Sequence, residues 1–341
     1  AAVMYDGERP DILPGIKVDN SIKALGEVAG FWRNYFDIPV IGVTGSNGKT
    51  TTKEMIASIL ALQGDVHFNP GNFNNHIGVP LTLLGLRHHH QFAVVEMGMN
   101  HPGEIAYLSK MARPSIALLL NVGTAHLEGL GTLAGVARAK AEILQGVSDS
   151  GSVIINADDR FVNYWLGRSK KLKNFTFGMN KNADVNGSVK MESGRQIVRI
   201  ELPNEYLDIK LNLIGNHNAA NAVAAATAAW VCGVGSDTIR AGLESIKAQP
   251  GRLETLPGPF NSSVIDDSYN CNPESLKAAI KTISSFSGPK VLILGDMAEL
   301  GDGSERFHSE AGRQALEAGI DHLFTFGSLA SHAAKSFGEN A

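Results

Sequence analysis

The sequence predicts an α/β fold, and three observations lead to that prediction. Short apolar runs of strand length alternate with longer segments whose apolar residues recur at helical spacing, which is typical of a mainly parallel sheet covered by helices on both faces. From about residue 175 to 213 the pattern changes to short alternating strands with glycine turns, which predicts a small antiparallel addition. After Pro250-Gly251, a candidate hinge, strands and helices alternate again and predict a second, Rossmann-like α/β domain.

The individual elements follow from the spacing of apolar residues. Ile22, Leu25 and Val28 predict a helix over 20–36, and Pro39 marks the entry to a buried strand that ends at Val43. The next predicted elements are helix 50–62, strand 66–68, helix 80–86, strand 92–97, helix 103–111, strand 116–122, helix 133–144 and strand 153–156. Beyond the antiparallel addition we expect an alanine-rich helix after residue 216, helix 238–246, strands 263–265, 291–294 and 323–326, and helices 274–283 and 305–318.

A glycine-rich turn follows the first buried strand, with the sequence Val43-Thr44-Gly45-Ser46-Asn47-Gly48-Lys49-Thr50-Thr51. Its second half fits the phosphate-loop (P-loop) pattern G-x-x-x-x-G-K-[ST], whereas Val43 stands where the pattern has its first glycine, so Gly45 has to supply the flexibility. Backbone N–H groups, the positive end of the following helix and Lys49 suit phosphates, and the Thr50 hydroxyl suits Mg²⁺. A plain glycine turn explains the glycines but not Lys-Thr, so we expect a nucleotide site.

Composition and charge are those of a globular protein. With 341 residues, 43% of them hydrophobic and 19% charged, we expect about two domains. The net charge of -4, without a basic run, argues against nucleic acid as the main partner. The longest apolar stretch, 219–231, is too short for a membrane span, and Cys232 and Cys271 lack metal-ligand spacing, so we expect a reduced cytoplasmic protein. The chain starts at Ala1, and we expect residues 1–14 to belong to a fragment or a trimmed chain.

Polar residues at strand ends can complete the site. Glu96 lies at the carboxyl end of a buried strand, where open parallel sheets place ligands, and can hold Mg²⁺ or else cap the next loop. His126 holds the same kind of position after the next strand, although a lone histidine there is more often an ordinary loop residue. Asn74 and Asn75 lie in a polar loop that can bind a peptide or sugar, or simply form turns. Patterning alone makes Lys140 a solvent-exposed lysine on a helix.

Several motifs occur together in one order and resemble those of the Mur ligases of peptidoglycan synthesis. They are Thr44-Gly45-Ser46-Asn47-Gly48-Lys49-Thr50-Thr51, Glu96-Met97-Gly98, His126, Lys140, Gly215-Asn216-His217-Asn218-Ala219-Ala220-Asn221-Ala222, Pro250-Gly251-Arg252 and Asp266-Asp267-Ser268-Tyr269-Asn270. Within the family, the stretches 74–80, 137–142, 267–273 and 295–301 most resemble the member that adds D-alanyl-D-alanine to UDP-N-acetylmuramoyl-tripeptide. The likeness covers nearly the whole chain.

The resemblance implies an ATP-dependent ligase that turns the tripeptide carboxylate into an acyl phosphate and joins it to the amine of D-alanyl-D-alanine. It implies ATP binding by Thr44, Gly45, Ser46, Asn47, Gly48, Lys49, Thr50, Thr51, Asn218 and Asn221. It implies Mg²⁺ binding by Thr50, Glu96, His126 and a carbamylated Lys140, and we expect substrate binding by Asn74 and Asn75. Catalytic roles are implied for Lys49, Lys140, His126, Arg252 and Asp267, the last two reaching the phosphates and ribose when the domains close.

The resemblance also divides the chain. Residues 1–36 are expected to be a remnant of an amino-terminal UDP-sugar domain with a linker helix, 37–250 the central ATP-binding ligase domain, and 251–341 an incomplete carboxy-terminal ligase domain. We expect a monomer without membrane insertion. Two other functions stay open: a sister Mur-type or folylpolyglutamate-type ligase with a different amino acid substrate, and a non-ligating ATP-binding protein.

Overall fold

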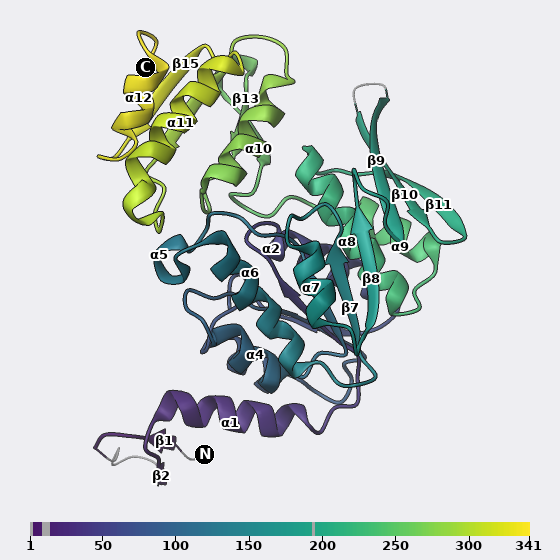
Figure 1. Cartoon of the computed structure of the whole chain (residues 1–341). Coiled ribbons are helices and arrows are strands. Elements are labelled where there is room, and N and C mark those ends of the chain that lie inside the picture. The colour runs from purple at the N-terminus through teal and green to yellow at the C-terminus, as the bar shows by residue number, and fades with distance from the viewer. Residues whose placement is uncertain (1–2, 9–13, 193–194) are drawn as a thin grey trace.

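A nine-stranded sheet organises the middle of the chain in the computed structural model, which describes residues 3–8, 14–192 and 195–341 (Figure 1). From edge to edge its strands are β11 (Glu205–Lys210), β10 (Arg195–Leu202), β9 (Val185–Glu192), β8 (Lys173–Gly178), β7 (Ser152–Asn156), β6 (Ile116–Leu119), β3 (Val40–Thr44), β5 (Phe92–Glu96) and β4 (Val66–Phe68). Strands β9 to β11 pair antiparallel, and all other neighbours in the sheet pair in parallel. The predicted mainly parallel sheet is confirmed, and the antiparallel addition prolongs that same sheet.

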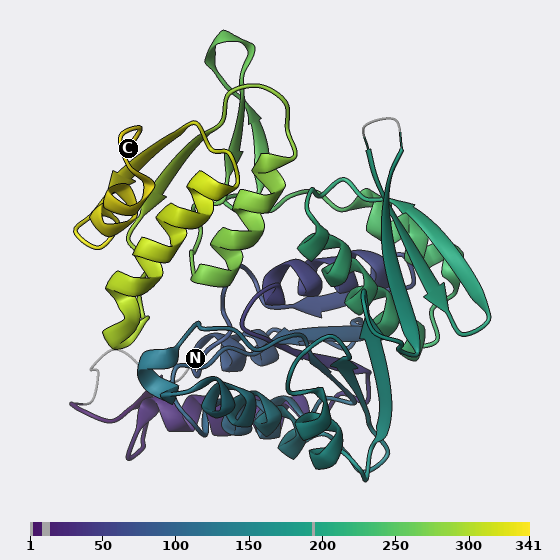
Figure 2. The same ribbon diagram turned by 45° about the horizontal axis from the view of Figure 1, so that its top comes forward.

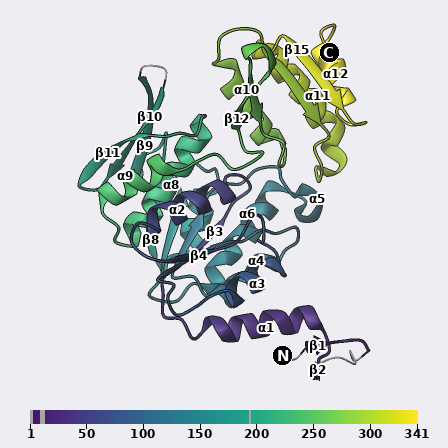
Figure 3. The same ribbon diagram turned by 180° about the vertical axis from the view of Figure 1, so that it is seen from behind.

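Helices cover both faces of this sheet, as Figure 3 shows. One face carries α2 (Lys49–Leu60), α8 (Asn216–Val231) and α9 (Ser236–Ser245); the other carries α1 (Ser21–Arg33), α3 (Gly78–Leu84), α4 (Glu104–Ala112), α6 (Leu133–Ala141) and α7 (Val162–Arg168). Each face has its own hydrophobic core between the sheet and these helices. Because side chains alternate along a strand, Ile41 and Val43 of β3 enter the core under α2, α8 and α9, and Val40 enters the core on the opposite face. Strand β3 is therefore buried on both faces, which explains its unbroken apolar sequence.

The second domain is smaller and stands apart from the sheet (Figure 2). It contains the antiparallel pair β12 (Glu254–Pro257) and β13 (Ser263–Asp266), the parallel pair β14 (Val291–Gly295) and β15 (His322–Phe326), and the helices α10 (Pro273–Ser284), α11 (Ser304–Glu317) and α12 (Ser331–Phe337). Its core contains Leu276, Ile280, Leu292 and Leu323. Strand β14, helix α11 and strand β15 form a parallel strand–helix–strand unit, as expected of a Rossmann-like domain.

The amino-terminal end lies on the opposite side of the central domain from the second domain (Figure 1). Strands β1 (Val3–Tyr5) and β2 (Gly15–Lys17) pair in parallel and precede α1, and the short helix α5 (Leu127–Leu130) lies between β6 and α6. Among the residues that the structure describes, no helix combines the length and apolar character that a membrane crossing requires.

The predicted elements differ from the structure where the chain turns toward the phosphate loop or forms short segments. The strand expected over 116–122 ends at Leu119, because the following residues bend so that Ser46 N donates to Asn121 O at 3.0 Å. The helix expected to reach residue 144 is α-helical to Ala141 and then tightens into a 3₁₀ turn over Glu142–Gly146. No element was predicted for the short strands β1, β2 and β12 or for the short helices α5, α7 and α12.

Candidate active site

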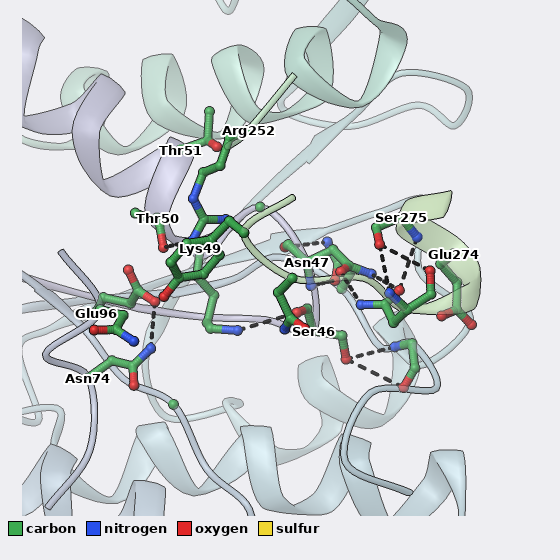
Figure 4. Close-up of a pocket in the computed structure, with 18 of the residues that line it drawn as sticks. Ser46, Asn47, Lys49, Thr50, Thr51, Asn74, Glu96, Arg252, Glu274 and Ser275 are labelled. Atoms are coloured by element: carbon green, nitrogen blue, oxygen red, sulfur yellow. Dashed lines mark hydrogen bonds between the residues drawn. The ribbon is translucent and has the colours of Figure 1, made fainter. Parts of the chain in front are cut away.

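A cavity of about 600 Å³ lies between the central and second domains, where β3, β5 and β6 reach their carboxyl ends (Figure 4). This is the position where open parallel sheets bind ligands. Most predicted site residues line it: Ser46, Asn47, Gly48, Lys49, Thr50, Thr51, Asn74, Asn75, Glu96, His126, Asn218, Asn221, Arg252 and Asp267. Three predicted site residues do not line it: Thr44, Gly45 and Lys140.

The two glycines of the phosphate loop serve different purposes. Gly48 has a φ of 81°, in the left-handed region, and a Cβ there would lie 2.3 Å from Asn221 Oδ1. Gly45 is not among the residues with positive φ, but its Cβ would lie 2.8 Å from Leu120 Cβ. Gly45 therefore does not need the left-handed region in this structure, and its missing side chain lets the loop pack closely on Leu120 after β6.

Lys49 folds back onto its own loop. Its Nζ donates to Gly45 O at 2.9 Å and to Ser46 O at 3.3 Å (Figure 4). Burial lowers the pKa of Lys49, Glu96 opposes that shift, and Arg252 adds to it. An ammonium held by weak carbonyl acceptors at the rim of a cavity is available to an incoming anion.

Glu96 presents a free oxygen to the cavity. The residue is 1% exposed, its Oε1 accepts from Asn74 Nδ2 at 2.8 Å, and its Oε2 is buried without a hydrogen-bond partner among the described residues. A buried carboxylate oxygen is costly unless a cation or donor pairs with it. Together with the Thr50 hydroxyl, this unpaired oxygen fits a divalent cation that prefers oxygen ligands.

Within the described ranges no three His, Cys, Asp or Glu side chains converge on one point. This does not conflict with Mg²⁺, because that ion keeps several waters and takes one or two protein carboxylates plus phosphate oxygens.

His126 connects the cavity with the second domain. Its φ of 63° turns the chain after β6, and its Nδ1 lies 2.8 Å from Glu299 Oε2, although the two atoms are not aligned as a hydrogen bond. Burial and then the charge of Lys49 lower the pKa of His126, while Glu299 opposes the shift. Neutral imidazole, the form that binds metals, is therefore favoured.

Lys140 is buried, so the prediction of a solvent-exposed lysine is wrong. The residue is 2% exposed on α6, which lies against the sheet rather than turning this side chain to water. Burial lowers the pKa of Lys140 well below its usual value, Lys49 lowers it further, and Asp159 opposes the shift. A neutral amine is the form that can react with CO₂.

Two residues of the second domain line the cavity together with the phosphate loop, and one of them contacts the loop. Arg252 Nη2 donates to Thr50 Oγ1 at 3.0 Å, and its guanidinium lies 4.0 Å from the centroid of the Tyr269 ring. Asp267 Oδ1 accepts from Leu253 N at 3.2 Å, and burial raises the pKa of Asp267 to about 6. A guanidinium and a carboxyl group from the chain after the hinge therefore line the same cavity.

The start of α10 makes further contacts that the sequence did not reveal. Asn272 Nδ2 donates to Asn47 Oδ1 at 2.7 Å, while Asn272 Oδ1 caps α10. Glu274 accepts from Thr124 N at 3.1 Å and from Thr124 Oγ1 at 2.7 Å. The pair Asn272-Pro273 is a helix-start signal, but the residues it meets lie in another domain and cannot be read from local spacing.

Several asparagines near the cavity use part of their hydrogen-bonding capacity on other residues of the protein. Asn75 Oδ1 accepts from Ile77 N and Gly78 N at the start of α3, so the turn-forming role is real although the residue also lines the cavity. On α8, Asn221 Nδ2 donates to Asn218 Oδ1 at 3.3 Å, and both residues are buried.

Comparison with protein families decides the family of this chain. The Mur ligase middle domain matches residues 43–229, and the Mur ligase, glutamate ligase domain matches residues 251–340. The chain belongs to the Mur ligase family. The resemblance inferred from the motifs is thereby confirmed.

Individual Mur ligases extend this result. The UDP-N-acetylmuramoyl-tripeptide--D-alanyl-D-alanine ligase of Escherichia coli (strain K12) is 42% identical over 94% of this chain and 71% of the relative. Its counterpart in Bacillus subtilis (strain 168) is 38% identical over 98% of this chain and 73% of the relative. MurF from Acinetobacter baumannii has a crystal structure with a TM-score of 0.93 and 36% identity, over 98% of this chain and 73% of that one. MurF from Thermotoga maritima in complex with ADP gives a TM-score of 0.89 and 29% identity, over 97% and 77%.

Proposed function

We propose that this chain is the ATP-dependent ligase that joins D-alanyl-D-alanine to UDP-N-acetylmuramoyl-tripeptide, forming a C–N bond in peptidoglycan precursor synthesis. Relatives that are 42% and 38% identical carry that name. The observation that carries the proposal is the single cavity in which the phosphate loop, buried Glu96 and the second-domain residues Arg252 and Asp267 meet. A protein that only bound a nucleotide would not need these two residues opposite its phosphate loop.

The proposed reaction has two steps. A carboxylate oxygen of the tripeptide attacks the γ-phosphorus of ATP, the bond from that phosphorus to ADP breaks, and an acyl phosphate forms. The amine nitrogen of D-alanyl-D-alanine then attacks the acyl carbon and loses a proton as inorganic phosphate leaves. Because the reacting groups do most of the chemistry, the protein contributes positioning and charge neutralisation.

Residues around the loop have roles that suit this task. The backbone N–H groups of Gly48 to Thr51, at the start of α2, would hold the phosphates, because Ser46 N and Asn47 N already donate to Asn121. Lys49 would leave its loop carbonyls for the outer phosphates. Arg252 would neutralise phosphate charge, and Asp267 would accept from the ribose. Asn218 and Asn221 would lie at the adenine, and Asn74 and Asn75 at the tripeptide.

The residues proposed to hold Mg²⁺ are Thr50, Glu96, His126 and a carbamylated Lys140. When bound, the ion would neutralise charge on the phosphate oxygens. Carbamylation would bond the Lys140 nitrogen to the carbon of CO₂ with loss of a proton, and would turn a potential cation into an anion. We further propose that the domains divide as 37–250 and 251–341, and that the protein acts as a monomer in the cytoplasm.

Phosphate release from ATP and Mg²⁺ tests the proposal, with UDP-N-acetylmuramoyl-tripeptide and D-alanyl-D-alanine supplied together and singly. The proposal expects release that needs both acceptors and is lost in Lys49→Ala but not in Lys110→Ala, a change of an exposed lysine on α4. Release with a different amino acid would indicate a sister ligase. ATP binding that Lys49→Ala weakens, without any release, would indicate a non-ligating protein.

A further inference from the structure

Lys53 is a fully buried lysine one turn beyond Lys49 on α2. Its side chain is 0% exposed, and its Nζ lies 5.5 Å from the centroid of the Phe68 ring. Its Nζ donates to Asn69 O at 2.7 Å and to Gly71 O at 3.1 Å, and it forms an ion pair with Glu54, whose Oε1 lies 3.0 Å away. Burying a charge is costly even when it is paired, and an apolar residue would fill the same space more cheaply. The lysine is therefore expected to do something that packing alone does not require.

The carbonyls that Lys53 holds belong to the loop over residues 69–77, between β4 and α3. Asn69, the first residue of this loop, is fully buried. Its Oδ1 accepts from Glu96 N at 2.6 Å, and its Nδ2 donates to Phe73 O at 2.6 Å and to Glu96 O at 3.3 Å. Asn69 thus joins two points of the loop to the end of β5, and Lys53 fixes Asn69 to α2.

The other end of this network reaches the cavity. Asn74 O accepts from Gly98 N at 2.8 Å, and Asn74 Nδ2 donates to Glu96 Oε1 at 2.8 Å. A Cβ on Gly98 would lie 2.8 Å from Asn74 Oδ1, so glycine at this position lets the Asn74 amide lie close to the backbone. The hydrogen bond from Asn74 to Oε1 leaves Oε2 as the Glu96 oxygen without a partner, on the side of the cavity (Figure 4).

We infer that Lys53 and Asn69 are positioning residues that hold the loop over 69–77 and the Glu96 carboxylate at a set distance from the phosphate loop. The same rigid helix carries Lys49 and Thr50 at its start and Lys53 one turn later, so one element places the phosphate side and the acceptor side of the cavity together. The part of this inference that concerns catalysis rests on the proposed function, because the proposed function is what places Asn74 at the tripeptide.

The test compares Lys53→Met with Lys53→Arg, which keeps the charge and several donors, and with Ile239→Ala, a change of a fully buried core residue on α9. Hydrogen–deuterium exchange of the peptide over 69–77 should be about tenfold faster in Lys53→Met, the factor expected for losing one hydrogen bond to a charged group. The KM for UDP-N-acetylmuramoyl-tripeptide should rise by about the same factor, while the KM for ATP stays within about twofold. Lys53→Arg should recover part of both effects, and Ile239→Ala should show neither.

A purely structural lysine gives a different result. In that case Lys53→Met would lower the melting temperature as Ile239→Ala does, with unchanged exchange over 69–77 and an unchanged tripeptide KM, and the inference would be overturned. Should Lys53→Met not yield folded protein, Lys53→Gln, which keeps an amide donor, is judged by the same two readouts. Hydrogen exchange needs no turnover, so a wild-type chain without ligase activity refutes the proposed function while the role of Lys53 is still decided.

Discussion

Asp267 offers a test of the site's electrostatics through protein stability. Burial raises the pKa of this carboxyl to about 6, against 3.8 for an ordinary aspartate. The loss of hydration destabilises the carboxylate more than the hydrogen bond from Leu253 N and the charge of Arg252 stabilise it. Asp267→Asn keeps the oxygen that accepts from Leu253 N and removes the ionisation. We expect the variant to be more stable than the wild type at pH 8 and to lose ATP-dependent phosphate release, an exchange of function for stability.

The sign and the pH window follow from the pKa. Below pH 3.8 the carboxyl is protonated in both the folded and the unfolded chain, and the substitution changes little. Between that pH and about 6 the unfolded chain releases the proton first, so wild-type stability falls as the pH rises. Above about pH 6 the full difference of about 3 kcal/mol applies, and water around this half-buried group reduces the expected gain to about 1.5 kcal/mol.

Urea unfolding at pH 4, 6 and 8 measures this gain. The control is Asp266→Asn, because hydrogen bonds from Ser268 lower the pKa of Asp266 and the opposite sign is expected there at pH 8. A gain for Asp267→Asn that is present at pH 8 and absent at pH 4 supports the assignment. An Asp267→Asn variant that is less stable than the wild type at pH 8 would show that the ionised carboxylate stabilises the fold, and the reasoning would be refuted.

Three further changes probe other parts of the structure. Lys140→Met should remove a carbamate ¹³C signal seen with labelled bicarbonate and weaken Mg²⁺ activation of phosphate release by about 10- to 100-fold; an unchanged Mg²⁺ titration would contradict the proposed ligand set. Glu274→Ala removes the contacts with Thr124, so small-angle X-ray scattering should give a larger radius of gyration, whereas Glu317→Ala on α11 should not. Gly242→Ala places a Cβ 2.5 Å from Ile59 Cα and should cost about 2 kcal/mol in thermal unfolding, while Gly235→Ala, with open space but at the N-cap of α9, should cost only about 0.5 kcal/mol.

Local patterns were sufficient wherever an element's own residues decide its structure. Strand β4, Val66–Phe68, has the predicted bounds, and β3 differs from its prediction by one residue at its end, because buried apolar runs ended by turn residues have few alternatives. The phosphate loop and the position of Glu96 also follow from local order, since a polar residue after a buried parallel strand lies at the ligand-binding edge.

Contacts between distant segments could not be predicted in this way. Lys140 stands in an ordinary helical pattern, and its burial depends on how α6 lies against the sheet. Gly45 is required by Leu120 rather than by its own backbone angles. Lys53 gave a faint signal, because it shares the apolar face of α2 with Ile56 and Leu60, but its acceptors belong to a loop that sequence spacing cannot place.

The contacts that the second domain makes on the phosphate loop affect how ATP affinity is to be understood. Arg252 donates to the Thr50 hydroxyl, Asn272 Nδ2 donates to Asn47 Oδ1, and Glu274 lines the same cavity. A nucleotide therefore competes with the chain's own side chains, and the measured dissociation constant equals the intrinsic one divided by the fraction of molecules in which the loop is free. Loosening these contacts would tighten ATP binding without adding any new contact to the nucleotide.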